Sequence, residues 1–298
     1  MSYDLFFKYQ GSKQLTLEEF ERYFESRLNY KVNDKQAFYE NEDTGVYFSF
    51  DYEQPIIDKE NTEIFSGSAR IGLYINTYRP HVFALEAEPE VAEFVKKFDL
   101  LINDPQLDGN KSDKYNSVDF IRGWNSANKF SYKVTMAVDE SDTTLFYLPA
   151  ADIERCWAWN YNRNKLQEKI GEDFFVPMII FLLIDGAVKS CITWSDAIPT
   201  VFPVVDKVTI FKYELARSKL FSLKKKGDFV LLNYSEITHL LSGIPTSDKK
   251  LRYNGFNPSN EQYNDVIKWI HSLKPMQANQ LRISIDQILD RELLESIE

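Results

Sequence analysis

The chain has 298 residues, of which 44% are apolar and 15% aromatic, with only 11 glycines and 11 prolines. This composition supplies enough apolar surface for a packed core and excludes a collagen-like or disordered chain. The net charge of −10 is uneven, because residues 1–106 contain 20 acids and 11 bases, whereas the rest contains 25 acids and 24 bases. A field of one sign repels its own kind, so residues 1–106 are poor candidates for contact with nucleic acid, anionic membranes or anionic substrates. A basic protein is the better partner.

Residues 1–106 are expected to form β-α-β-β-β-α-β. The helix after the first strand begins with a capping box, Thr16 with Glu19, and Pro89 is placed in the first turn of the second helix. The expected elements are strands at 3–9, 36–40, 46–52, 70–77 and 100–103, with helices at 17–28 and 89–98. This order is close to the split β-α-β sandwich of ferredoxin-like folds, with one strand added or one long strand broken, and we predict a ferredoxin-like α+β domain over 1–106. Such a fold carries no function by itself.

The sharpest acidic cluster is Glu40, Glu42 and Asp43, at a hairpin loop that ends in Gly45. The alternating Asp/Asn pattern of a calcium loop is absent, so we expect no metal here. Two interpretations remain: a solvated hairpin tip, and a contact site for a basic partner.

Residues 107–130 are polar and turn-rich, and we predict a linker docked by a short helix at 120–124. The larger domain, 131–298, is predicted to be α+β with a mainly antiparallel sheet. Its central hairpin spans 177–194, with the Asp185-Gly186 turn that tolerates positive φ. The other expected elements are strands at 132–138, 144–148, 204–213, 229–232 and 281–285, with helices at 149–170, 236–241, 259–270 and 286–297.

The segment from Trp157 to Asn164 has the most unusual local composition in the chain. One interpretation is a cleft that binds a sugar or a base between aromatic rings and amides. The other is a helix whose tryptophans face the core and whose polar side chains face water. The residues of the possible cleft are Trp157, Asn160, Tyr161, Arg163, Asn164 and Trp194.

Catalytic motifs are scarce. The three histidines, His81, His239 and His271, are neither at the spacing of a helical metal pair nor beside a cysteine, and no nucleophile elbow or phosphate-binding glycine loop occurs. We therefore expect no metal and no cofactor. Asp196 and Asp206 flank a loop with two prolines, and two carboxylates about 6–9 Å apart could act on a glycosidic bond.

Cys156 and Cys191 are too few for a disulfide framework and are expected as buried apolar side chains in a reducing compartment. The N-terminus lacks the basic and apolar regions of a signal peptide, and the most apolar run, 174–184, is about half of the roughly 20 residues that a membrane helix needs. We therefore expect a cytoplasmic protein without membrane contact.

The leading hypothesis is a non-catalytic binding protein. It would resemble an immunity protein or antitoxin in occluding a basic protein partner, such as a nuclease toxin, by electrostatic steering. The alternative is a carbohydrate- or nucleotide-processing enzyme that uses the paired carboxylates.

Overall fold

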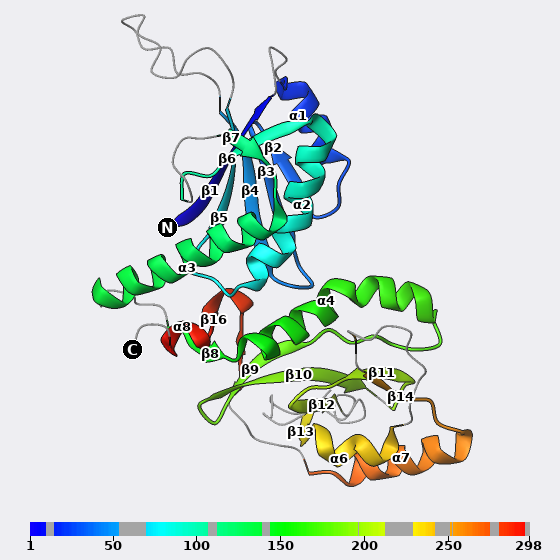
Figure 1. Cartoon of the computed structure of the whole chain (residues 1–298). Helices are drawn as coiled ribbons and strands as arrows, with labels where there is room; N and C mark the ends of the chain where they lie inside the picture. Colours follow the sequence, from blue (N-terminus) through cyan, green and yellow to red (C-terminus); the bar gives the residue numbers. More distant parts are fainter. Residues whose placement is uncertain are drawn as a thin grey trace, which may run out of the picture. The chain divides into compact units, whose positions relative to one another are not determined.

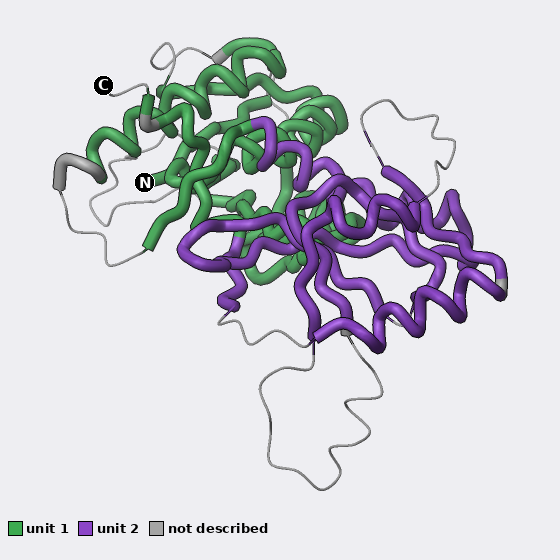
Figure 2. The backbone as a smooth tube through the Cα atoms, turned by 90° about the horizontal axis from the view of Figure 1, so that it is seen from below, with its two compact units in different colours: residues 1–150, 285–298 green, residues 151–284 purple. Residues whose placement is uncertain are grey.

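The computed structural model of the chain describes residues 1–9, 15–53, 70–106, 112–138, 144–195, 197–211, 229–241, 251, 253–274 and 280–295. They belong to two compact units, which are residues 1–150 with 285–298 (unit 1) and residues 151–284 (unit 2) (Figure 2). The predicted α+β class with mostly antiparallel sheets is confirmed. Among the described helices, none combines the length and the apolarity that a membrane span requires.

Unit 1 is built on a seven-stranded antiparallel sheet in the order β2-β3-β4-β5-β1-β6-β7 (Figure 1). Burial alternates along β4, because one face of the sheet is covered by helices. The short strands β2 and β7, at the two edges, were not predicted. The seven strands are β1 (Ser2–Tyr9), β2 (Tyr30–Asn33), β3 (Gln36–Asn41), β4 (Val46–Glu53), β5 (Arg70–Asn76), β6 (Leu100–Asn103) and β7 (Ser112–Lys114).

Helices α1 (Leu17–Glu25) and α2 (Val82–Phe98) lie on one face of this sheet (Figure 1). The predicted capping box at Thr16 is confirmed. The predicted start of α2 is wrong, because the helix begins at Val82 and Pro89 lies inside it. The turns before Pro89 are stabilised by buried residues such as Val82 and Phe83. Phenylalanine rings fill the space between helices and sheet. The ring of Phe94 lies 5.2 Å from that of Phe50, and close ring contacts also join Phe7, Phe20 and Phe24.

The range predicted as a linker and a following strand differs most from the structure. Residues Ser117–Val138 form one helix, α3, which belongs to unit 1. Its buried residues Phe120, Trp124 and Tyr132 recur at helical spacing, and the Phe120 ring lies edge-on to Tyr3 at 5.7 Å. Of the polar residues that indicated a linker, Asn125, Ser126 and Lys129 are exposed on this helix, whereas Asn128 is buried and donates to the carbonyls of Thr77 and Arg79. Residues 107–111 of the predicted linker lie outside the described residues.

The C-terminal residues, 285–298, belong to unit 1, whereas the sequence pattern placed them in the second domain. Strand β16 (Ile288–Asp290) pairs in parallel with β8 (Phe146–Leu148), so unit 2 is inserted in the chain between these strands. The predicted helix at 286–297 is wrong, because the segment consists of η3 (Ile285–Gln287), β16 and the short α8 (Glu292–Glu295). Its apolar residues Ile288 and Leu289 are fully buried in this short strand.

Unit 2 has a five-stranded sheet in the order β13-β12-β10-β9-β15, in which only β10 and β12 pair in parallel. The predicted hairpin is confirmed, since β9 and β10 pair antiparallel through Asp185 and Gly186, whose φ angles are 49° and 79°. The elements of this unit among the described residues are α4 (Ala150–Ile170), β9 (Ile180–Ile184), β10 (Ala187–Ser195), β11 (Thr200–Pro203), β12 (Lys207–Phe211), β13 (Phe229–Asn233), α6 (Tyr234–Ile237), η2 (Thr238–Leu240), β14 (Tyr253–Phe256), α7 (Asn260–Ser272) and β15 (Leu281–Ile283).

Candidate partner-binding surface

The acidic cluster predicted as a contact site lies at the hairpin between β3 and β4, which are neighbours in the sheet (Figure 1). Asn41 organises the turn: its Oδ1 accepts a hydrogen bond from the Asp43 backbone N–H at 3.1 Å, and its carbonyl accepts one from the Gly45 N–H at 2.7 Å. Gly45 has φ of 76°, a left-handed conformation that glycine adopts without strain. We call residues 40–45 the hairpin tip.

The hairpin tip is fastened to α2 by a buried carboxylate, Glu86, which is 1% exposed. Its Oε1 accepts hydrogen bonds from the Tyr39 hydroxyl at 2.8 Å, the Asn41 amide at 2.6 Å and the Thr44 hydroxyl at 3.1 Å. Burial, followed by the charge of Glu86, raises the pKa of Tyr39, so this hydroxyl stays a donor at neutral pH. Three donors on one oxygen fix the shape of the tip.

The three predicted acids come together at this tip but differ in their surroundings. Glu42 is exposed and Asp43 is half-buried. Glu40 forms an ion pair with Lys31 on the neighbouring strand, with 2.7 Å between Nζ and Oε2. Because both side chains of this pair are largely exposed, the attraction is weak and leaves Glu40 accessible to a competing cation.

The C-terminal segment supports the tip from the other side. Cγ2 of Ile285 would lie 2.9 Å from a Cβ at Gly45, so the Ile285 side chain packs directly on the backbone of the tip. The Tyr47 hydroxyl donates to Asp286 at 3.5 Å and accepts from Arg79.

A second contact holds the same segment. The carboxylate of Asp290, 6% exposed, accepts from the His81 backbone N–H at 2.8 Å and lies 2.6 Å from His81 Nδ1. The tip is therefore held by side-chain contacts from α2 and from the C-terminal segment.

The division of the chain sharpens the charge asymmetry. Unit 1 contains 31 acids and 17 bases, a net charge of −14, whereas unit 2 contains 14 acids and 18 bases, a net charge of +4. Unit 2 is inserted within the chain of unit 1. A count of charges in sequence order therefore combines part of acidic unit 1 with unit 2 and shows a smaller difference. A charge of −14 on one compact unit attracts basic partners and speeds their association.

The residues of the possible cleft are divided by burial. Asn160, 7% exposed, holds the backbone of Ile179, to which its amide donates at 2.9 Å and from which it accepts at 2.9 Å. Trp194 is fully buried, and its Nε1–H donates to the Ile198 carbonyl at 3.0 Å. Both side chains are occupied with the core of unit 2, beyond the reach of a ligand.

The other residues of this group lie nearer the surface. Trp157 and Tyr161 are half-buried, and their rings stack with centroids 5.3 Å apart on one side of α4. Arg163 is half-buried and Asn164 is exposed. A cleft formed by these four residues stays a prediction.

Of the two predicted catalytic carboxylates, Asp196 lies outside the described residues. The use of Asp196 and Asp206 as a catalytic pair therefore stays a prediction. Asp206, just before β12, forms hydrogen bonds with Ser190 of β10. Its Oδ2 accepts from both the backbone N–H and the hydroxyl of Ser190, each at 2.8 Å, and its own N–H donates to the Ser190 carbonyl at 3.1 Å. These contacts fasten β12 to β10.

No group of three His, Cys, Asp or Glu side chains within the described ranges has the arrangement of a metal site. No protein-family model matches the chain, and neither a curated protein nor a solved structure matches it. Sequence reasoning missed Glu86 and Asp290, whose only signal is an acid among apolar neighbours in the chain.

Proposed function

We propose that unit 1 is a protein-binding module that captures a basic protein through the hairpin tip. In this proposal the chain acts in the cytoplasm like an immunity protein or antitoxin, and it occludes a basic partner such as a nuclease toxin without catalysing a reaction.

The observation that carries the proposal is an acidic tip, fastened by three hydrogen bonds to Glu86, on a unit with a net charge of −14. The field of the unit raises the association rate of a basic partner, and salt screens it over about 8 Å at physiological ionic strength. A tip that Glu86 has already ordered loses little conformational entropy on binding, which favours affinity. Exposed Glu42 is the side chain best placed for the first contact.

A ferredoxin-like assignment of unit 1 belongs to the same proposal. Four adjacent strands, β6-β1-β5-β4, are antiparallel, and α1 and α2 occur in the chain where a split β-α-β sandwich requires them. The β2–β3 hairpin edge and β7 extend that sheet at its two ends. The assignment supports the view of the unit as a scaffold, and it adds no activity.

The test begins with the tagged full-length chain as bait in its native host, with mass spectrometry to identify the partner. Association and dissociation rates are then measured at low and high salt for the wild type and for Glu42→Lys. We expect Glu42→Lys to slow association by about threefold or more at low salt and to change dissociation less.

Glu172→Lys is the matched control, because it reverses one exposed acid in unit 2 and changes the total charge equally. A smaller effect of this control supports the hairpin tip as the contact site. Equal effects of the two variants, or a partner whose association is indifferent to salt, would contradict the proposal.

A further inference from the structure

The exposed side of α3 carries apolar side chains that the core of unit 1 does not use. Val118, Phe130 and Val134 are 71%, 64% and 37% exposed. Bases lie beside them on the same helix, since Arg122, Lys129 and Lys133 are all exposed. We call these six residues the α3 stripe. Burying an aromatic and two valines in a contact is favourable by about 25 cal/mol for each Å² removed from water.

The sign of the charge on the α3 stripe is opposite to that of its unit. Asp119 is the one acid in α3, and it pairs with Arg122 at 2.9 Å. In the part of the chain that the structure describes, Lys129 and Lys133 form no ion pair. Two unpaired cations beside exposed apolar groups, on a unit with a net charge of −14, form a local basic surface.

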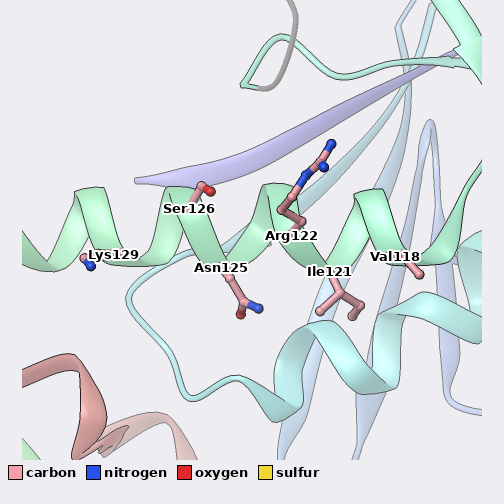
Figure 3. A pocket seen from close by; sticks show the side chains of 6 residues that line it. All are labelled: Val118, Ile121, Arg122, Asn125, Ser126 and Lys129. Carbon is pink, nitrogen blue, oxygen red and sulfur yellow. The ribbon is translucent and has the colours of Figure 1, made fainter. Parts of the chain in front are cut away.

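A hollow of about 420 Å³ follows the first half of this surface. All six side chains that line it, from Val118 to Lys129, come from α3 (Figure 3). Ile121 and Asn125 point to one side of the helix and Arg122 to the other (Figure 3), and the lining residues extend along α3 from Val118 to Lys129. The α3 stripe extends from Val118 to Val134, which corresponds to about 24 Å of helix.

We propose that the α3 stripe docks an acidic amphipathic helix of a partner protein. The length of the α3 stripe, about 24 Å, fits a second helix packed along α3, and its apolar and basic side chains call for apolar and acidic ones on the partner. This surface differs from the hairpin tip in place and in sign, so the inference does not rest on the proposed function.

Two other occupants fit the observations less well. A planar anionic membrane extends well beyond a Debye length of about 8 Å and would face the other acids of unit 1, whereas a slim helix stays close to Lys129 and Lys133. A second copy of the chain offers the acids of α1, but that helix buries its apolar residues Phe20 and Phe24 in its own core.

The test uses the full-length chain and a fluorescein-labelled helical peptide of about 16 residues, long enough to span the α3 stripe. The peptide carries leucine along one face and glutamate on the flanks. We expect saturable binding by fluorescence anisotropy, weakened at least about tenfold in the double variant Lys129→Glu/Lys133→Glu, because two attractions become repulsions. Phe130→Ser should weaken binding through lost apolar contact alone.

The matched control is Lys8→Glu/Lys35→Glu, which reverses two exposed bases of unit 1 outside α3 and should leave the affinity within about twofold. Equal affinity of the wild type and the α3 double variant overturns the inference. It is also overturned if the wild type, and not the double variant, binds phosphatidylserine vesicles, or forms oligomers by sedimentation. Those outcomes assign the surface to a membrane or to a second copy.

Discussion

Two buried side chains, Glu86 in unit 1 and Asn160 in unit 2, hold their neighbours by different chemistry. The Glu86 carboxylate accepts three hydrogen bonds from side chains of β3 and the hairpin tip. The Asn160 amide both donates to and accepts from the backbone of Ile179.

The difference follows from what each group can do. An ionised carboxylate only accepts, so it gathers donors from several elements and brings its charge with it. An amide donates and accepts at once, so it can join an open backbone segment to a helix without any charge. The contacts of Glu86 therefore involve an acidic group, whereas those of Asn160 involve neutral groups alone.

The largest effect is expected at Glu86. Glu86→Ala removes the acceptor of three buried donors, at about 1–3 kcal/mol for each, and should destabilise unit 1 by about 3–5 kcal/mol. Hydrogen exchange read by mass spectrometry should show the loss over β3, β4 and α2, with unit 2 unchanged. Glu25→Ala, an exposed acid at the end of α1, is the control and should change little. Unchanged protection of the hairpin tip would mean that Glu86 does not hold it.

Asn160 is the corresponding test in unit 2. Asn160→Ala leaves the N–H and carbonyl of Ile179 without partners in the core and should cost about 2–4 kcal/mol by urea unfolding. Asn164→Ala, one turn along α4 and exposed, should cost less than about 0.5 kcal/mol. Equal effects would show that the core of unit 2 does not depend on this amide.

The contrast between these two asparagines shows how far the sequence pattern reaches. Local signals predicted the Thr16 capping box and the Asp185-Gly186 turn correctly, because the interacting atoms lie within a few residues of each other. Periodicity likewise found most strands of unit 1. It could not separate Asn160 from Asn164, since burial is decided by the distant segment that α4 contacts.

The errors have the same origin. The apolar residues of α3 are widely spaced among polar ones, and the helix is recognised only when Phe120 is seen against Tyr3. The C-terminal segment becomes part of unit 1 only through its pairing with β8, across the whole of unit 2. At the candidate site, the acids of the hairpin tip could be predicted, whereas Glu86, which fixes them, could not.

Alanine substitutions at two glycines with positive φ distinguish the cost of backbone strain from the cost of a steric clash. A Cβ at Gly186 would meet no other atom within 4 Å, so Gly186→Ala should lower the free energy of unfolding by about 1 kcal/mol, from backbone strain alone. At Gly45 the same Cβ would meet Ile285 at 2.9 Å, so Gly45→Ala should cost about 2–3 kcal/mol. Thermal unfolding of the two variants measures the difference. Equal costs would mean that the C-terminal segment is not packed against the hairpin tip.

The smallest expected signal comes from the two thiols, both in unit 2. Burial raises the pKa of Cys156 to about 12 and that of Cys191 to about 12. An unfolded thiol has a pKa of about 8.5, so at pH 8–9 the native thiols are almost entirely protonated and inert, whereas unfolded ones react. We expect labelling by a disulfide reagent only as fast as unit 2 opens, in each of the single variants Cys156→Ala and Cys191→Ala.

The sign of the pH dependence follows from the raised pKa values. The folded state keeps protons that the unfolded state loses, so the thiols' contribution to stability is complete below about pH 8.5 and falls as the pH rises toward 12. Because unit 1 has no cysteine, Glu86→Ala should leave the labelling rate unchanged if the two units open independently. Rapid labelling of the native wild type at pH 8 would contradict the burial of these thiols. Faster labelling in Glu86→Ala would show that loss of the carboxylate in unit 1 also opens unit 2.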